Sequence, residues 1–201
     1  MALPTEPECM RDNGPMDEKP WSRMRASIYS FFARNPESNR MIAEVAALRD
    51  SDRALDIGCG PGAAVRGSAQ IVSEALGVDP SLHMVAIATR RSAGIANVRF
   101  EAGAAERLPF ADASFTVIWT VHAFHHWADQ TKGLEEVVRV LRPGGRLYVI
   151  ERETKGQHGL TRAAAENLAS RMDRSGFIET TVAKRKKELI VSGYAPQVAD
   201  E

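Results

Sequence analysis

The ten residues from Arg53 to Gly62 constrain the fold of this chain more than any other stretch. They begin with a short apolar run that is typical of a buried strand. Asp56 lies near the end of this run, and three glycines follow it at every second position: Gly58, Gly60 and Gly62. Such a turn lets the backbone approach a ligand closely. Ligands of open α/β sheets bind beyond the carboxyl ends of the strands, so the segment predicts a binding site.

The composition of the chain excludes several classes of protein. Its 201 residues are enough for one domain with a proper core, and 26 basic residues balance 26 acidic ones. A net charge of zero argues against a general nucleic-acid binder. Two cysteines, Cys9 and Cys59, are too few for a secreted disulfide scaffold. No apolar run approaches the ~20 residues that span a bilayer, so we expect a cytoplasmic protein without a membrane span.

Strands and helices alternate along most of the chain. Apolar runs predict strands over 53–57, 74–78, 97–100, 114–120 and 145–151, and helical periodicity predicts helices over 62–72, 81–93, 130–140 and 159–175. Residues 177–183 and 188–192 are expected to form a hairpin around the basic run Lys184–Lys187. Alternation of this kind predicts a doubly wound, mostly parallel seven-stranded α/β sheet with a C-terminal antiparallel hairpin.

The chain divides into four segments on the same grounds. Residues 1–19 combine prolines with charges and are expected to form a mobile leader. Residues 20–49 predict N-terminal helices, the first with an apolar stripe that suits it to act as a lid. Residues 50–192 form the predicted α/β domain, and residues 193–201 are expected to be a loose tail.

Two classes of adenosine ligand are compatible with the glycine turn taken alone. Gly58, Gly60 and Ala63 match the dinucleotide fingerprint, and Asp79 follows about 20 residues later, where it could bind a ribose. A dinucleotide turn, however, holds a pyrophosphate, which the carboxylate of Asp56 would repel. Asp56 favours a ligand with a positive or hydrogen-bond-donating group, and an NAD-dependent oxidoreductase remains as an alternative.

Four segments of the chain resemble the class I S-adenosylmethionine-dependent methyltransferases. Leu55–Gly62 is similar to motif I of that family and Gly77–Ser81 to its second motif. Ala105–Phe115 resembles the segment that enters the fourth strand, and Glu135–Gly145 the helix and turn before the fifth. The likeness covers roughly residues 50–192 and is greatest to the small-molecule branch that includes ubiquinone and menaquinone methyltransferases. It implies methyl transfer from S-adenosylmethionine to a small-molecule acceptor.

The resemblance also implies roles for individual residues. Asp56 and the glycine turn would hold the amino-acid end of the cofactor, and Asp79 its ribose diol. Ala104 departs from the family, which often has an aspartate there that reaches the adenine. The cofactor-binding residues that the resemblance implies are Asp56, Gly58, Gly60, Gly62, Asp79, Pro80, Ala104, Ala105, Glu106 and Thr120.

Three histidines follow the fourth predicted strand, on the side where the family binds its acceptor. Three interpretations of His122, His125 and His126 are open. They could bind a metal, but no acidic or cysteine ligand has matching spacing, so we expect none. One of them could act as a general base, with His122 the first candidate and His125 the second. They could also cap loop backbone or line the cofactor pocket.

The segment from Arg152 to Gly159 is short for a cover over an acceptor. The cover would then come from the N-terminal helix or from a second subunit, so a homodimer is one expectation. The short cover and the missing acid at Ala104 leave a second function open. This alternative is a module that binds S-adenosylmethionine or its product without catalysis.

Overall fold

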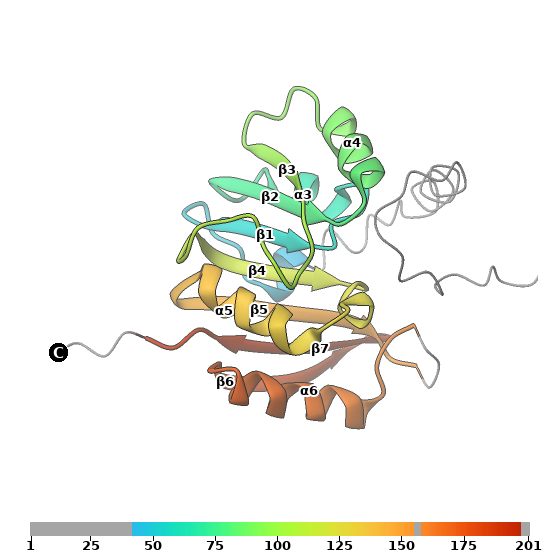
Figure 1. The fold of residues 1–201 in the computed structure, drawn as a ribbon, viewed down its shortest axis with the longest axis vertical. Coiled ribbons are helices and arrows are strands. Elements are labelled where there is room, and N and C mark those ends of the chain that lie inside the picture. Colours follow the sequence, from blue (N-terminus) through green and yellow to red (C-terminus); the bar gives the residue numbers. More distant parts are fainter. Residues whose placement is uncertain (1–41, 155–157, 198–201) are drawn as a thin grey trace, which may run out of the picture.

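The protein forms one seven-stranded sheet with helices on both faces (Figure 1). The computed structural model describes residues 42–154 and 158–197, so the predicted leader, the helix expected from residue 20 and the last four residues of the tail lie outside the described residues. The strands are β1 (Arg53–Ile57), β2 (Glu74–Asp79), β3 (Val98–Ala102), β4 (Phe115–Val121), β5 (Leu141–Arg152), β6 (Ile178–Arg185) and β7 (Glu188–Tyr194). The helices are α3 (Ala63–Ser68), α4 (Leu82–Arg91), α5 (Gln130–Val140) and α6 (Arg162–Arg174), with a 3-10 turn η1 (Phe124–His126).

The strand order places one reversal at the centre of the sheet. The order is β3-β2-β1-β4-β5-β7-β6, with β1 to β5 parallel and β7 antiparallel to β5 and β6. This arrangement confirms the predicted fold class. The chain winds outward from β1 to β3 and then returns to the other side of β1 as β4. In doubly wound sheets, the crevice at this reversal is the usual ligand site.

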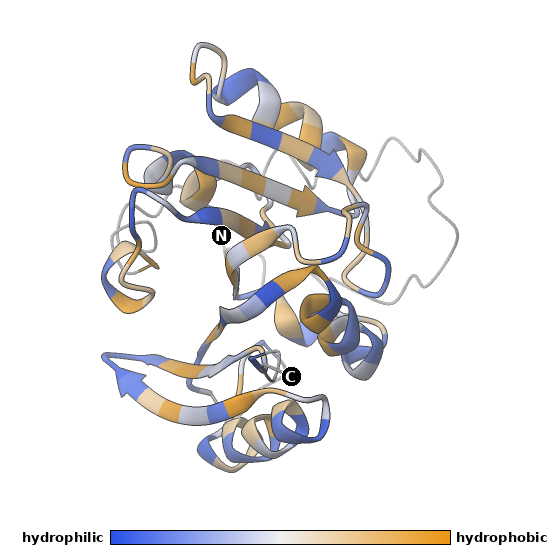
Figure 2. Ribbon diagram, turned by 90° about the vertical axis from the view of Figure 1, so that its left-hand side faces the viewer, coloured by the Kyte–Doolittle hydropathy of each residue, from blue (hydrophilic) through white to orange (hydrophobic). Residues whose placement is uncertain are grey.

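Apolar side chains on the two faces of the sheet form two cores. One core contains α5 and α6 with Leu55, Val149 and Val191 of the strands, and the other contains α3 and the helical residues 42–45 with Ala54 and Trp119. Figure 2 shows the result as apolar residues along the central strands and hydrophilic residues on the outer surfaces of the helices. None of the helices in the described ranges is both long and apolar enough to cross a bilayer.

A buried ion pair joins the segment before β1 to the sheet. Arg146 lies 2.5 Å from Asp52 and donates to the carbonyl oxygen of Ala46 at 2.8 Å. Asp52 also accepts a hydrogen bond from Thr116 at 2.7 Å, so its buried charge is fully partnered. This network lies at the amino edge of the parallel strands and therefore leaves the carboxyl edge free for other chemistry.

Several element boundaries differ from the sequence prediction, and three of them have a visible structural basis. Helix α3 begins only after Gly62, whose φ of 74° is left-handed, and it ends at Ser68. Strand β5 begins at Leu141 rather than at residue 145, because Arg142–Gly145 form an irregularity in the ladder to β4. Strand β7 continues through Tyr194, two residues into the expected tail.

Candidate functional site

Three carboxylates lie at the carboxyl ends of parallel strands in the middle of the sheet. Asp56 is in β1, Asp79 ends β2 and Glu151 is near the end of β5. They are only 3%, 8% and 1% exposed. Burying an acid is unfavourable unless other groups stabilise it. Three such residues at one edge of a sheet therefore mark it as the candidate site.

Asp79 fixes the shape of the glycine turn. One carboxylate oxygen accepts the Gly60 N–H at 2.9 Å, and the other accepts the Ser81 N–H at 2.9 Å. The turn is also bound to β2 through the Gly58 N–H, which donates to the Val78 carbonyl at 2.8 Å. Burial raises the pKa of Asp79, and its two backbone hydrogen bonds act against this increase. Each oxygen keeps a lone pair with which it can accept from a ligand hydroxyl.

Two glycines of the turn meet different surroundings. A Cβ at Gly58 would lie 2.4 Å from the Cβ of Ala123, so this glycine lets the turn pack against the loop after β4. A Cβ at Gly60 would have no heavy atom within 4 Å. Gly60 therefore faces open space, and this is the space that a ligand lying on the turn would occupy. The turn thus joins the cofactor side of the site to the histidine loop.

Gly60→Ala should weaken cofactor binding without unfolding the protein. Gly60 has a φ of 51° with open space around it, so alanine adds roughly 1 kcal/mol of backbone strain. The new methyl group would project into the ligand space, and we expect at least a tenfold weaker affinity for S-adenosylhomocysteine by calorimetry. Gly94→Ala is the matched control, because Gly94 has a φ of 89°, open surroundings and a place in the α4–β3 connection. Equal affinities of the two variants for S-adenosylhomocysteine would contradict the assignment of the glycine turn to cofactor binding.

Asp56 is a buried acid with an unusual pKa. Burial, with a smaller contribution from Asp79, raises the pKa of Asp56 to about 7, while Trp119 acts in the opposite direction. Trp119 is its direct cross-strand neighbour in β4. Within the described residues, no cation is among the groups that shift this pKa, so the carboxylate is poorly stabilised. A positively charged ligand group would supply the missing stabilisation.

Thr120 carries a second unsatisfied group at the same edge. Its hydroxyl is completely buried near the end of β4 and has no hydrogen-bond partner among the residues that the structure describes. Buried hydroxyls are normally partnered. An unpartnered hydroxyl at the same carboxyl edge as Asp56, together with the open space at Gly60, suits a ligand with both donor and acceptor groups.

The predicted cofactor-binding residues in the segment after β3 differ from one another in exposure and in hydrogen bonding. Ala104 is exposed and its carbonyl accepts the Arg107 N–H, whereas the Ala105 side chain is buried in the core. The Glu106 carboxylate accepts the Asp129 N–H at 3.0 Å, at the start of α5. Ligand contacts from Ala105 would therefore come from its backbone, and Glu106 has one oxygen already engaged. Pro80 is exposed just after Asp79.

His125 forms a pair with a buried acid. Its Nδ1 lies 2.9 and 3.1 Å from the two carboxylate oxygens of Glu151, and its backbone N–H donates to the same carboxylate at 3.3 Å. A carboxylate is an acceptor, so Nδ1 carries the proton and Nε2 is left with a free lone pair. An imidazole held in this tautomer by an acid is the arrangement of a general base.

His122 has a different partner and a different position. Its Nε2 lies 2.9 Å from the carboxylate of Glu188 at the start of β7. His122 has a left-handed φ of 52°, which turns the chain out of β4. The two candidate bases therefore pair with different acids. Within the described ranges, no three histidine, cysteine or acidic side chains are arranged to bind a metal.

His126 and Cys59 lie at the same end of the sheet as the candidate site, but both are poorly suited to catalysis. The ring of His126 lies 3.8 Å from that of His125, and burial together with His125 lowers its pKa to about 4. His126 is therefore neutral at pH 7. Cys59 is buried under the turn, where burial and the charges of Asp56 and Asp79 raise its thiol pKa. A thiol of this kind is a packing residue and not a nucleophile.

Glu151 and Glu188 are site residues that the sequence analysis did not select. For Glu151 a signal existed, because it directly follows the apolar run Leu147–Ile150 at the end of a predicted strand. Asp56 was selected on the same pattern. Glu188 had no comparable signal, since it follows a basic run and its partner His122 is 66 residues away.

Comparisons with known proteins find that this chain is similar to methyltransferases. The family model described as "Methyltransferase domain" matches residues 55–149. The chain is 38% identical over 140 residues to an uncharacterized methyltransferase YcgJ of Bacillus subtilis, which is 67% of this chain and 54% of that protein. It is also 40% identical over 110 residues to the 27-O-demethylrifamycin SV methyltransferase of Amycolatopsis mediterranei. That alignment covers 53% of this chain and 40% of the length of the relative.

A solved structure shares the fold. The crystal structure of a SAM-dependent methyltransferase from Aquifex aeolicus superposes with a TM-score of 0.73 at 18% identity, covering 86% of this chain and 98% of that one. In contrast, the chain spans only about half the length of the curated relatives it matches.

Proposed function

Because this chain belongs to the class I S-adenosylmethionine-dependent methyltransferases, we propose that it transfers a methyl group from S-adenosylmethionine to a small-molecule acceptor. The observation that carries the proposal is the set of unsatisfied groups at one edge of the sheet. Among the residues that the structure describes, Asp56 has no compensating cation and the Thr120 hydroxyl has no partner, and Gly60 faces open space.

The cofactor residues have separate roles in this proposal. Asp56 binds the ammonium group of the cofactor, and Thr120 binds its polar amino-acid end. Asp79 accepts hydrogen bonds from the ribose hydroxyls while it holds the turn through Gly60. The glycine turn lies beneath the cofactor, and Pro80 with the backbone of Ala104 and Ala105 borders the adenine. Glu106 lies at the same border.

The acceptor residues supply positioning and proton removal. S-adenosylmethionine provides a methyl group on a sulfonium, which needs no further activation. The chain therefore has to align the acceptor and take its proton, and both steps contribute strongly to the rate. His125 is the proposed base, because Glu151 fixes its tautomer and leaves Nε2 free. As that nitrogen takes up the proton, the buried carboxylate stabilises the imidazolium.

The base supports a particular class of acceptor. A base is useful where the attacking atom carries a proton, as in a phenol, an enol or an alcohol. The similar rifamycin enzyme is named for an acceptor that lacks a methyl group on oxygen. The neutral charge balance supports a small molecule over nucleic acid. A homodimer and a cytoplasmic location remain predictions.

The proposal is tested with S-adenosylmethionine labelled in the methyl group. Wild-type protein is incubated with a panel of phenols, enols, amines and alcohols, and the label is followed into product. We expect transfer to at least one hydroxyl acceptor, with inhibition by S-adenosylhomocysteine. Tight S-adenosylmethionine binding without transfer to any acceptor would favour the alternative, a non-catalytic binding module.

A further inference from the structure

The basic hairpin between β6 and β7 lies at the same edge as the proposed site. Strand β7 runs antiparallel to β5, with Glu188 paired with Arg152. The Glu153 N–H donates to the Lys187 carbonyl at 2.8 Å, which holds the hairpin turn against the end of β5. The turn therefore lies at the carboxyl end of β5, where Glu151 and Arg152 belong to opposite faces of the sheet. The basic run thus borders the same end of the sheet as the proposed site.

The acids at this edge already have partners. Glu151 is paired with His125, and Glu188 with His122. The other ion pairs join Lys184 to Glu153 and Arg185 to Glu44. Each carboxylate near the hairpin thus has a cation or an imidazole beside it, and none is left over for a further cation.

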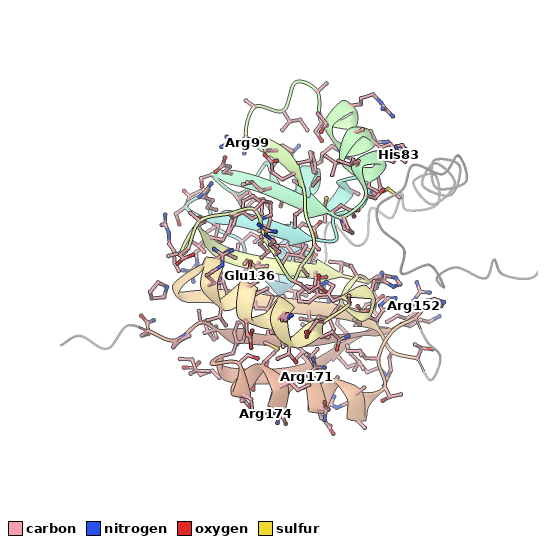
Figure 3. All side chains as sticks on the ribbon, in the orientation of Figure 1. His83, Arg99, Glu136, Arg152, Arg171 and Arg174 are labelled. Carbon is pink, nitrogen blue, oxygen red and sulfur yellow. The ribbon has the colours of Figure 1, made fainter. Side chains whose placement is uncertain are left out.

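Two cations of the same edge have no such partner. Arg152 and Lys187 are exposed, and neither forms an ion pair within the part of the chain that the structure describes. Figure 3 shows Arg152 at the edge where β1 and β4 end, away from Arg171 and Arg174 on α6. The Arg152 side chain shares a sheet face with Glu188, its direct cross-strand neighbour. Glu188 already binds His122, so the guanidinium is available to a ligand.

We propose that Arg152 and Lys187 bind an oxyanion, a carboxylate or a phosphate, on the acceptor. The inference rests on the proposed methyl transfer and specifies its substrate class as an anionic small molecule. A guanidinium offers two parallel donors that match an oxyanion, and a lysine adds a point charge beside it. The pair would anchor the acceptor by its charged end while its reacting hydroxyl extends over the carboxyl edge of the sheet towards the cofactor.

The test uses ligand-observed NMR titrations of protein loaded with S-adenosylhomocysteine. Benzoate and phenyl phosphate are the two anionic probes, and benzamide is the neutral probe. We expect at least one anion to bind tenfold tighter than benzamide, and the two anions distinguish a carboxylate site from a phosphate site. The Arg152→Gln/Lys187→Gln variant should lose this preference. Arg174→Gln, which removes an exposed arginine of α6, should keep it.

Several results would overturn the inference. Equal binding of the three probes would do so, as would an unchanged preference in the double variant or an equal loss in Arg174→Gln. Tight binding of a 12-nucleotide single strand that the double variant abolishes would assign the cations to nucleic acid. The titrations are repeated without S-adenosylhomocysteine, whose own binding is measured in parallel. Failure of that binding counts against the proposed function, whereas failure of the anion preference alone counts against this inference.

Discussion

Replacing His125 with asparagine is expected to lower the rate of methyl transfer by about 10²- to 10⁴-fold, the usual contribution of a positioned base. The change removes the free Nε2 nitrogen that would take the acceptor proton. It should leave the affinity for S-adenosylhomocysteine within about twofold, because the proposed cofactor contacts come from β1, β2, β4 and the segments after β1, β2 and β3, and none comes from His125. Single-turnover rates with the best acceptor of the panel, combined with calorimetry, separate the two effects.

His122→Asn is the matched control for His125→Asn. It removes an imidazole from the same loop that is also bound to a carboxylate, that of Glu188. We expect its rate to stay within about tenfold of wild type. Glu151→Gln should reproduce most of the His125→Asn effect, because a neutral amide stabilises an imidazolium poorly. A large loss in His122→Asn with a small one in His125→Asn would assign the base to His122.

Replacing Asp56 with asparagine is expected to stabilise the unliganded protein while it abolishes tight cofactor binding. Burial raises the pKa of Asp56 to about 7. Between about pH 4 and pH 7 the unfolded carboxyl is ionised while the folded one holds its proton, so the free energy of unfolding falls as pH rises through this range. Asparagine has no proton to lose, so at pH 8 it should gain on the order of 3 kcal/mol over wild type.

Cofactor affinity should respond to pH in the opposite direction. The ammonium group binds the ionised form of Asp56, so the affinity of wild-type protein for S-adenosylhomocysteine should fall up to about tenfold per pH unit below pH 7. At pH 8, Asp56→Asn should bind about 10- to 100-fold more weakly than wild type, and its affinity should not change between pH 5 and pH 7. Chemical denaturation and calorimetry at pH 5, 7 and 8 test these expectations. If the affinity of Asp56→Asn for S-adenosylhomocysteine changed with pH as that of wild type does, the role of Asp56 would be disproved.

The fold and the cofactor side were predictable because their signals are local. A strand, an acid and a glycine turn lie within ten residues around Asp56, and β2 with Asp79 repeats the strand and acid. The alternation of strands and helices then fixes the parallel order, which brings these ends together. The same locality explains the hairpin, whose basic run separates two strands that are adjacent in sequence.

The acceptor side depends on contacts between residues that are far apart in the chain. His125 meets Glu151 across 26 positions and His122 meets Glu188 across 66, and neither spacing is visible as a pattern. His122 was the first candidate base because it follows the strand most closely, yet the free nitrogen and the buried acid belong to His125. The burial of Ala105 in the same core cluster as Leu108 likewise depends on tertiary packing and not on its motif.

Calorimetric titration of the full chain with S-adenosylhomocysteine and with NAD tests the central claim most directly. We predict micromolar or tighter binding of S-adenosylhomocysteine and no measurable binding of NAD. Asp79→Ala should weaken the first by ~1–3 kcal/mol, since it removes the acceptor of the ribose hydroxyls and frees the Gly60 N–H. Tight binding of NAD, with S-adenosylhomocysteine unbound or indifferent to Asp79→Ala, would contradict the account.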